Sequence, residues 1–210
     1  FSMRIFNADG SQAQMCGNAT RCIGLYVHEK GLTDKTDISL ETLSGIKHIR
    51  LHMDADGQVG AVSVDMGPFR CAETLQEVSA AGRTFAGRIV DVGNPHFVVF
   101  ADEGAQAQID RFGPGIEHAP LFPRRTNVEF ARLTAPGHIR MRVWERGSGI
   151  TMACGTGACA TAVAARKAGL TGDRCTVEMD GGSLEIGIGA DGHIRMTGGA
   201  RIVFEGTIHV

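Results

Sequence analysis

The chain contains an internal repeat, which limits the folds open to it more than any other feature of the sequence. In each copy, a Cys-Gly pair precedes a segment of helix-forming residues that stops at Gly-Leu-Thr. The cysteine, the predicted helix and the closing glycine are Cys16, 19–30 and Gly31 in the first copy, and Cys154, 158–168 and Gly169 in the second. The spacing from cysteine to glycine is the same in both copies, so a chance match between alanine-rich segments is the weaker explanation. We therefore expect two related halves.

Each predicted helix begins within four residues of its cysteine. Asn18 and Thr156 are residue types that cap the unpaired N–H groups of a helix start, and Lys30 and Lys167 lie in the last turns, where a positive charge is favourable. Both helices are mostly apolar around their circumference, which indicates that strands enclose them. Each half therefore places a cysteine at a helix N-terminus.

Short alternating runs separated by glycine pairs fill most of the remaining chain. Such runs are typical of strands joined by hairpins, and we predict strands over 59–66, 88–92, 96–101, 139–144, 175–179, 184–188 and 202–204. Only the two repeated segments are predicted as substantial helices. The fold class is therefore α+β, with two pseudo-symmetric lobes, each a curled, mostly antiparallel sheet around a central helix. Alternation is lost near Met66-Gly67-Pro68, which places the lobe boundary there.

The composition favours a small-molecule substrate as partner over nucleic acid or a membrane. The chain has 210 residues, 43% of them hydrophobic, and a formal net charge of -2, so it offers no basic surface for nucleic acid or anionic lipid. No apolar stretch is long enough to span a membrane, and residues 1–6 lack the pattern of a signal peptide. We therefore expect a cytoplasmic protein whose six cysteines are thiols rather than a disulfide framework.

A cysteine at a helix N-terminus is suited to proton transfer. An ordinary thiol has a pKa of about 8.5, and the helix dipole lowers this pKa because it stabilises the thiolate. The unpaired N–H groups beside it bind anions such as a carboxylate, and they stabilise a carbanion whose charge spreads onto that carboxylate. Two such sites suit inversion at the α-carbon of an amino acid, with one sulfur for each face. We predict a cofactor-independent amino-acid epimerase with Cys16 and Cys154 as the catalytic residues.

Two other interpretations of the cysteines are weaker. A cysteine is commonly a small buried apolar residue, and we expect this role for Cys22, Cys71, Cys159 and Cys175. Zinc binding by a helix needs ligands on one of its faces, and neither pair of cysteines within a predicted helix has such a spacing. We therefore predict no metal site.

Several polar residues lie at turns or strand edges, where they can face a substrate. Asn94 and His96 belong to a predicted turn between two strands, and Glu145-Arg146 follows a predicted strand shortly before Cys154. Asn7 and Asn127 lie at strand edges. Amides can donate and accept hydrogen bonds, and a Glu-Arg pair can bind an ammonium and a carboxylate. An asparagine that shapes its own turn and a solvated ion pair are the ordinary alternatives.

Taken together, these motifs resemble the diaminopimelate epimerase family. The matching stretches span nearly the whole chain in the family's order. They are Arg4-Ile5-Phe6-Asn7-Ala8-Asp9-Gly10-Ser11, Met15-Cys16-Gly17-Asn18 with Arg21-Cys22, Gly93-Asn94-Pro95-His96, Asn127-Val128-Glu129-Phe130, Glu145-Arg146-Gly147-Ser148-Gly149 and Ala153-Cys154-Gly155-Thr156-Gly157.

The resemblance implies an activity, the interconversion of LL- and meso-diaminopimelate in lysine and cell-wall precursor biosynthesis, and a role for each candidate residue. Cys16 and Cys154 are then the acid/base pair, with His96 close to them, and Glu145 binds the reacting ammonium. The reacting carboxylate is bound by the backbone N–H groups of Gly17, Asn18, Gly155 and Thr156, and the distal end of the substrate by Asn7, Asn94, Asn127 and Arg146. The resemblance also implies a homodimer and two lobes, 1–66 completed by a last strand within 201–210, and 67–200.

The chain departs from the family in two places, and two rival functions stay open. Family members begin with a segment that carries a Gly-x-Gly-Asn-Asp-Phe loop, and the sequence as given starts after the place of that loop, as a fragment would. In addition, Ala19-Thr20 replaces the usual Gly-Ala pair. One rival is a racemase of the same fold for another amino acid, such as proline or histidine, although Arg146 argues against a substrate without a charged distal end. The other rival is a non-catalytic module that binds small anions and leaves both cysteines with ordinary thiol pKa values.

Overall fold

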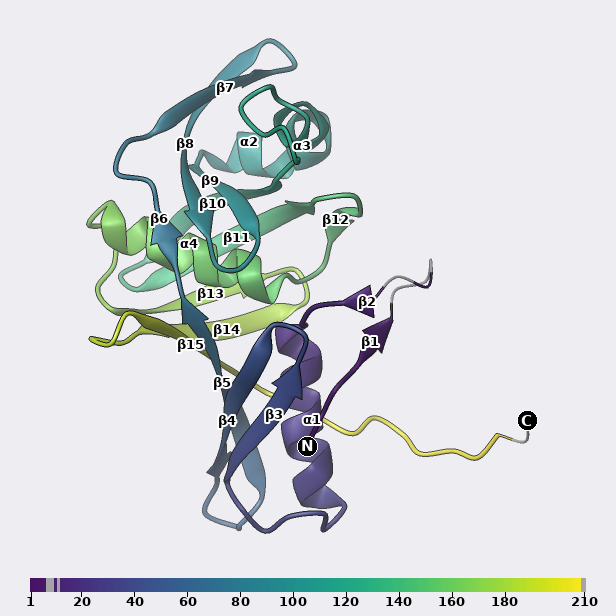
Figure 1. The fold of residues 1–210 in the computed structure, drawn as a ribbon. Coiled ribbons are helices and arrows are strands. Elements are labelled where there is room, and N and C mark those ends of the chain that lie inside the picture. The colour runs from purple at the N-terminus through teal and green to yellow at the C-terminus, as the bar shows by residue number, and fades with distance from the viewer. Residues whose placement is uncertain (7–9, 11, 209–210) are drawn as a thin grey trace. The chain divides into compact units, whose positions relative to one another are not determined.

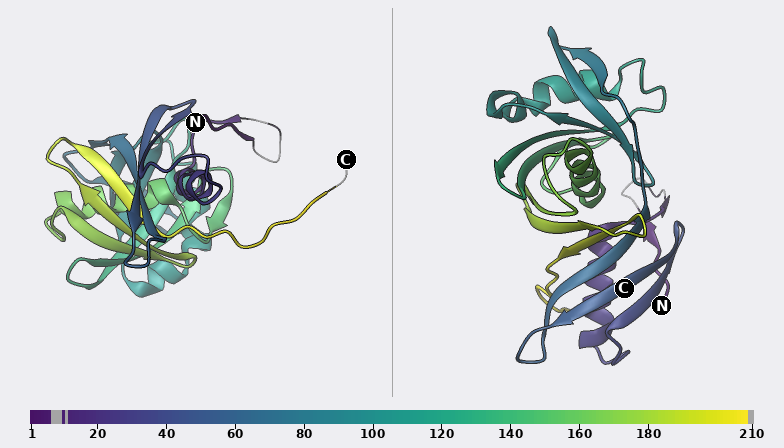
Figure 2. Two further views of the ribbon diagram at one scale, coloured as in Figure 1. Left: turned by 90° about the horizontal axis from the view of Figure 1, so that it is seen from below. Right: turned by 90° about the vertical axis from the view of Figure 1, so that its left-hand side faces the viewer.

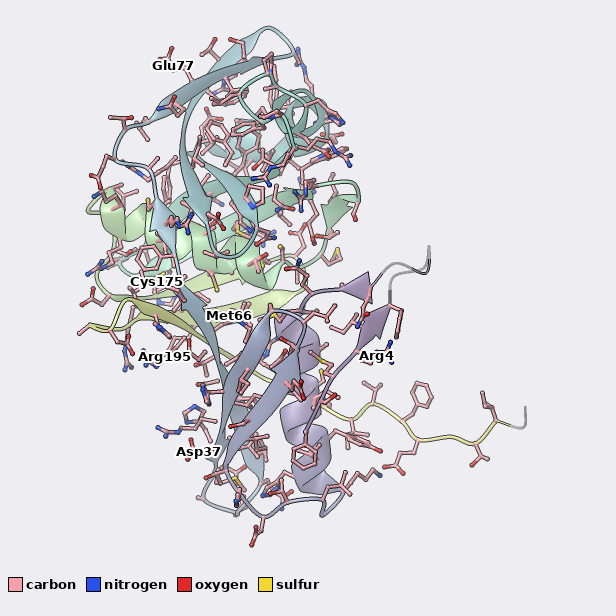
Figure 3. The ribbon with its side chains drawn as sticks, viewed as in Figure 1. Arg4, Asp37, Met66, Glu77, Cys175 and Arg195 are labelled. Atoms are coloured by element: carbon pink, nitrogen blue, oxygen red, sulfur yellow. The ribbon has the colours of Figure 1, made fainter. Side chains whose placement is uncertain are left out.

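The structure is a computed structural model that describes residues 1–6, 10 and 12–208, and it divides into two compact units. The first unit comprises Phe1–Asp65 and Thr197–Val210, and the second comprises Met66–Met196. The chain passes from the first unit to the second within β5 (Val59–Pro68), at Met66, which is labelled in Figure 3, and it returns within β15 (His193–Gly198). No helix in the described ranges is both long and apolar enough to cross a membrane.

In the first unit, helix α1 (Gly17–Glu29) packs on an antiparallel sheet (Figure 1). The sheet contains β3 (Asp37–Thr42), β4 (Gly45–Met53) and β5. At Gly24 of α1, an added Cβ would lie 2.7 Å from Cγ2 of Ile49 on β4, so the missing side chain lets the helix approach the sheet closely. Cys22 and Tyr26, on the other side of the helix, are exposed, and the expectation that Cys22 is buried is therefore wrong.

The second unit is built on a sheet that curls around α4 (Gly155–Lys167), as the end-on view of this helix in Figure 2 shows. The strand order is β15-β14-β13-β11-β10-β9-β8-β6, with β12 beside β11 and β7 beside β8. The sheet is mostly antiparallel, but β9 pairs parallel with β10, and β11 with β13. The remaining bounds are β6 (Arg70–Cys71), β7 (Gln76–Ala80), β8 (Arg83–Asp91), β9 (Pro95–Phe100), β10 (Asn127–Ala135), β11 (His138–Glu145), β12 (Gly149–Thr151), β13 (Arg174–Met179) and β14 (Gly182–Ile188).

Small side chains allow the sheet to enclose α4. Every residue from Gly157 to Ala165 is buried, and five of these nine residues are alanines. The helix contacts β8, β9, β10, β11, β13 and β14, which lie before and after it in the sequence. The predicted enclosure of the second helix is confirmed.

The repeat extends upstream of the two helices. In the first unit, β1 (Ile5–Phe6) pairs antiparallel with β2 (Gln12–Ala13), and Cys16 follows β2 by three residues. In the second unit, β11 pairs antiparallel with β12, and Cys154 follows β12 by three residues. Each copy is therefore a hairpin, a cysteine and a helix, and α1 and α4 have 13 residues each.

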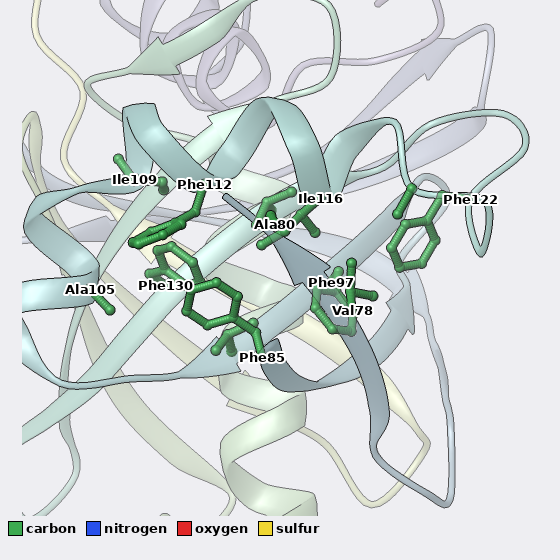
Figure 4. Close-up of a cluster of buried hydrophobic side chains, with 13 residues drawn as sticks. Val78, Ala80, Phe85, Phe97, Ala105, Ile109, Phe112, Ile116, Phe122 and Phe130 are labelled. Atoms are coloured by element: carbon green, nitrogen blue, oxygen red, sulfur yellow. The ribbon is translucent and has the colours of Figure 1, made fainter. Parts of the chain in front are cut away.

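Buried hydrophobic side chains from strands β7, β8, β9 and β10 form a cluster with side chains from two further helices, α2 (Glu103–Ala107) and α3 (Ile109–Glu117) (Figure 4). The ring centroid of Phe85 lies 4.9 Å from that of Phe112 and 5.1 Å from that of Phe130. The expectation of only two substantial helices is wrong, because α3 forms across Gly113-Pro114-Gly115, a run typical of turns. The two glycines let α3 approach the side chains of Trp144 and Ala80.

Residues 201–208, all of which are described, form no strand. The predicted strand over 202–204 is therefore wrong in this structure. Val203 is 84% exposed and Phe204 is 85% exposed, so no sheet covers the apolar side chains of this segment.

Candidate active site

Cys154 is the N-cap of α4, with an extended backbone at φ −136° and ψ 110°. Its Sγ accepts a hydrogen bond from the backbone N of Gly157 at 3.4 Å and lies 3.5 Å from Oγ1 of Thr156. An added Cβ at Gly157 would lie 3.3 Å from this Sγ and 2.9 Å from Oε1 of Glu129. The glycine therefore lets a sulfur and a carboxyl oxygen approach the same turn of helix.

Burial raises the pKa of the Cys154 thiol to about 12, and the carboxyls of Glu145 and Glu129 contribute in the same direction. Hydrogen bonds from Thr156 and Gly157 lower this pKa, but by less. The expectation that the helix N-terminus lowers the thiol pKa is wrong for Cys154, because desolvation and two acidic neighbours outweigh the helix dipole. Cys154 is therefore a protonated thiol at neutral pH.

His96 is fully buried on β9 and connects Asn94 to Glu129. Its Nδ1 lies 2.6 Å from Oε1 of Glu129, and its Nε2 lies 3.0 Å from Oδ1 of Asn94. Nδ2 of Asn94 donates to Oγ1 of Thr156 at 3.3 Å. Burial raises the pKa of the Glu129 carboxyl, and His96 opposes this effect. The structure thus brings Asn94, His96 and Thr156 together with Cys154.

Asn127, the first residue of β10, uses its side chain to hydrogen-bond the backbone at Pro95 and at Arg146. Its Nδ2 donates to the carbonyl of Pro95 at 2.8 Å, and its Oδ1 accepts from the backbone N of Arg146 at 2.9 Å. The guanidinium of Arg146 is exposed, and its Nη1 donates to the carbonyl of Arg124 at 3.3 Å. Asn127 therefore sets the backbone position from which the Arg146 side chain extends.

Glu117, a buried residue on α3, accepts hydrogen bonds from residues on both sides of Glu145-Arg146. Its Oε1 accepts from the backbone N of Gly147 at 2.9 Å, and its Oε2 accepts from Nε1 of Trp144 at 2.7 Å. Glu117 lies in no predicted motif, because α3 itself was not predicted.

Glu145 ends β11 and is half-buried. Its Oε1 accepts a hydrogen bond from Oγ1 of Thr151 across the β11–β12 hairpin. The carboxyl of Glu145 adds to the effect of burial in raising the pKa of the Cys154 thiol.

Cys16 occupies the corresponding place in the first unit. It is the N-cap of α1 at φ −137° and ψ 116°, close to the angles of Cys154, but its half-buried side chain makes no capping hydrogen bond. Gly17 and Asn18 begin α1 as Gly155 and Thr156 begin α4, and the first N–H groups of an α-helix have no partner inside the helix. Asn7 lies outside the described residues.

Glu129 is a second residue near Cys154 for which the sequence predicted no role. A signal was present, because Glu129 is an acidic residue between Val128 and Phe130 in an otherwise apolar strand segment. All six cysteines are thiols. Among the residues that the structure describes, no group of three or more His, Cys, Asp or Glu is arranged to hold a metal ion.

Solved structures with a similar fold include racemases and epimerases of small amino acids. A probable proline racemase from Agrobacterium radiobacter has a TM-score of 0.71 and 18% identity, with 93% of this chain and 68% of that chain covered. A hydroxyproline epimerase from Agrobacterium vitis has a TM-score of 0.70 and 17% identity, with 93% and 67% covered. At these identities the likeness concerns the fold alone, and it confirms the predicted α+β class.

Sequence comparison identifies the family within this fold. The family model described as diaminopimelate epimerase matches residues 1–72 and 88–203. The chain is 54% identical to the diaminopimelate epimerase of Parabacteroides distasonis over 211 residues, which cover 100% of this chain and 78% of that protein. It is 44% identical to that of Methanococcus maripaludis over 223 residues, which cover 100% and 80%. The chain belongs to the diaminopimelate epimerase family.

Proposed function

We infer that the chain is an isomerase that interconverts LL- and meso-diaminopimelate, a step in lysine and cell-wall precursor biosynthesis. The observation that carries this inference is the family match over 1–72 and 88–203, which includes both cysteine-bearing helix starts. The relative from Parabacteroides is 54% identical, whereas the proline-type structures are 18% and 17% identical. Diaminopimelate is therefore favoured over proline as the substrate.

Two thiols are sufficient proton carriers for this reaction, and we propose that it uses no cofactor. The thiolate of one cysteine takes the proton from Cα, and the thiol of the other gives a proton to the opposite face of the resulting carbanion. The first sulfur ends as a thiol and the second as a thiolate, so protons and charges balance. Because the pKa of Cys154 is about 12, we assign Cys154 the donor role in the first turnover and Cys16 the base role.

The carbanion is stabilised through the carboxylate onto which its charge spreads. We propose that the backbone N–H groups of Gly17, Asn18, Gly155 and Thr156 bind this carboxylate, since they lie at the two helix starts where aligned peptide dipoles favour an anion. Glu145 binds the ammonium on the same α-carbon. His96 supports the site without contacting the reacting atoms.

The distal end of diaminopimelate carries an ammonium and a carboxylate. Its partners are therefore charged groups of both signs or neutral amides, which can donate and accept hydrogen bonds. A guanidinium has five N–H groups, so the contact of Arg146 Nη1 with the carbonyl of Arg124 leaves donors for the distal carboxylate. Asn127 retains a second Nδ2 hydrogen beyond its contact to Pro95. We propose that Asn7, Asn94, Asn127 and Arg146 hold this end.

We further propose a cytoplasmic homodimer, with the lobes formed by 1–66 with 201–210, and by 67–200, and with one cysteine in each lobe. The partner is the small molecule diaminopimelate, and we propose that the protein binds neither nucleic acid nor a membrane. The net charge of -2 supports the exclusion of nucleic acid, and membership of a biosynthetic enzyme family supports the cytoplasmic setting.

Solvent deuterium tests the function directly. LL-diaminopimelate incubated with the protein in D2O is expected to take up one deuterium at the inverted Cα and to yield the meso form, as followed by NMR and mass spectrometry. The Cys22→Ala variant, changed at an exposed thiol outside the proposed site, is the matched control and should retain the activity. Exchange on proline without exchange on diaminopimelate would favour the racemase alternative. Exchange on neither substrate would contradict the assignment as an epimerase.

A further inference from the structure

A chain of hydrogen bonds connects the carboxyl of Glu129 to the sulfur of Cys154 within the second unit. It runs from Glu129 to His96, Asn94, Thr156 and Cys154, and its heavy-atom distances in that order are 2.6, 3.0, 3.3 and 3.5 Å. The parallel pairing of β9 with β10 places His96 opposite Asn127, two residues from Glu129 on the same face of β10. The strand register therefore joins these segments, which lie far apart in the sequence.

Asn94 determines the direction of this chain. Its Oδ1 can only accept, so Nε2 of His96 carries a proton and donates it. Its Nδ2 can only donate, so Oγ1 of Thr156 accepts from it. The hydroxyl proton of Thr156 then remains available for Sγ of Cys154. In this direction a Cys154 thiolate has two donors, the Thr156 hydroxyl and the backbone N–H of Gly157.

The proton between Glu129 and His96 maintains this direction. Because Nε2 of His96 is protonated, Nδ1 either accepts from a protonated Glu129 or, in an imidazolium, donates to an ionised one. In both forms one proton lies between Oε1 and Nδ1, which are 2.6 Å apart. If the pair lost this proton, the remaining ring proton would move to Nδ1 and Nε2 would become an acceptor. Asn94 would then turn its amide, and Thr156 would donate to Asn94 instead of to the sulfur.

The surroundings of Glu129 favour retention of that proton. Its side chain is fully buried, and its Oε2 has no hydrogen-bond partner in the described structure. An ionised carboxylate with an unpaired oxygen is costly in such a site, whereas a neutral acid is much less so. The missing side chain at Gly157 lets Oε1 lie beside the start of α4, where an added Cβ would be 2.9 Å from this oxygen.

We propose that Glu129 is a positioning residue that, through the proton it shares with His96, orients the Asn94 amide and directs the Thr156 hydroxyl at the Cys154 thiolate. The inference rests on the proposed function only where it assigns this thiolate to proton transfer. The direction of the hydrogen bonds is independent of which substrate the enzyme takes.

Two substitutions of Glu129 separate this role from a simple packing role. In Glu129→Gln, the amide N–H replaces the carboxyl proton and donates to Nδ1, so we expect kcat within about threefold of the parent. Glu129→Met is similar in length but has no donor, so nothing fixes the direction of the chain. We expect its kcat to fall about tenfold or more, as for the loss of one hydrogen bond to a charged group, with KM little changed. Thr161→Val, a buried change on α4 outside the chain, is the stability control.

A double variant tests whether the two ends of the chain act as one unit. Thr156→Val removes the hydroxyl and leaves Glu129 in place, and we expect it to lower kcat at least as much as Glu129→Met does. Because both changes remove the same donor from the sulfur, the double variant should lose no more than the worse single variant. Additive losses would overturn the proposal.

Two readouts do not depend on turnover, so failure of the proposed function is distinguishable from failure of this inference. 15N NMR of histidine-labelled protein should show His96 protonated at Nε2 in the parent and in Glu129→Gln, and altered in Glu129→Met. With the shared proton in place, Glu129 and His96 together carry no net charge, so Glu129→Met changes the donor to the sulfur without removing a net charge beside it. Alkylation of Cys154 by iodoacetamide at fixed pH should therefore be about tenfold slower in Glu129→Met, because its thiolate loses a donor. Equal effects of Gln and Met on both readouts would show that Glu129 acts through its charge or volume and would overturn the proposal.

Discussion

The two helix starts have nearly the same backbone and different surroundings for sulfur. Cys16 and Cys154 differ by one degree in φ and six degrees in ψ, and each follows a hairpin and precedes a helix of 13 residues. Yet Cys154 is buried, accepts a hydrogen bond from Gly157 and has a pKa of about 12, whereas Cys16 is half-buried and accepts no capping hydrogen bond. The local motif therefore fixes where a thiol is placed, and the side chains packed around it determine which form of the thiol is stable.

Replacing either cysteine tests whether both helix starts are needed for chemistry. Cys16→Ala and Cys154→Ala are each expected to lower kcat for epimerisation by about a thousandfold or more, because each face of Cα needs its own proton carrier. Deuterium uptake at Cα measures the loss. Near-normal turnover in one variant would show that the two starts are unequal in function as well as in burial.

The hairpin loop before Cys154 provides the next test, since it carries Arg146. Arg146→Ala is expected to lower kcat/KM by a factor that corresponds to a loss of about 2 to 4 kcal/mol in transition-state stabilisation. The reason is that the distal end of the substrate loses a charged partner that becomes partly desolvated on binding. The exposed guanidinium contributes little to folding, so the melting temperature should change little. Arg166→Ala, at the other end of α4, is the matched control. An unchanged kcat/KM would remove Arg146 from the site.

Alkylation compares the two sulfurs directly. At pH 8, we expect iodoacetamide to modify Cys154 at least about tenfold more slowly than Cys16, because only the thiolate reacts and burial holds the pKa of Cys154 near 12. Because the pKa is raised, the thiolate fraction of Cys154, and with it the alkylation rate, should keep rising with pH until about pH 12. Peptide-resolved mass spectrometry gives both rates in one sample. Faster modification of Cys154 would contradict the burial argument.

The smallest expected effect concerns the cysteines within the helices. Cys159 is fully buried inside α4, whereas Cys22 is exposed on α1. Cys159→Ala should lower the free energy of unfolding by about 1 to 2 kcal/mol through lost packing, and Cys22→Ala by less than about 0.5 kcal/mol. Urea denaturation measures both. Equal losses would show that α1 is covered to the same extent as α4 in solution.

The repeated helices were predictable because their signals are local. The predicted segments 19–30 and 158–168 correspond to α1 at Gly17–Glu29 and α4 at Gly155–Lys167, each displaced by one to three residues at its ends. Helix α3 was not predictable from local signals, because Gly113, Pro114 and Gly115 oppose a helix and the packing of Phe112 on Phe85 stabilises it. The strand over 202–204 has the required alternation, but a strand also needs a paired neighbour, which a single segment does not specify.

The site was predictable to the extent that its residues lie in motifs. His96 was expected close to Cys154 and is connected to it through Asn94 and Thr156, whereas Asn94 was assigned to the distal end of the substrate. Their electrostatics were not predictable, because the pKa of Cys154 depends on desolvation and on Glu129, which strand pairing brings close. Helix position alone led to the opposite direction for that pKa. The sequence signal for this part of the site is an acidic residue, the fully buried Glu129, within an otherwise apolar strand segment.

The enclosure of α4 has a consequence for the order in which the second unit folds. The strands around this helix come from both sides of it in the sequence, from β8 at Arg83 to β14 at Ile188. The helix can form early, since its hydrogen bonds are local, but its burial needs long-range strand pairing, which is slow. Until β13 and β14 have added to the sheet, α4 and its N-cap residue Cys154 lack the part of their cover that these strands supply, which includes the contact of the Cys154 backbone N with Sδ of Met179. The helix that carries Cys154 is thus fully enclosed only after the chain has been made as far as Ile188.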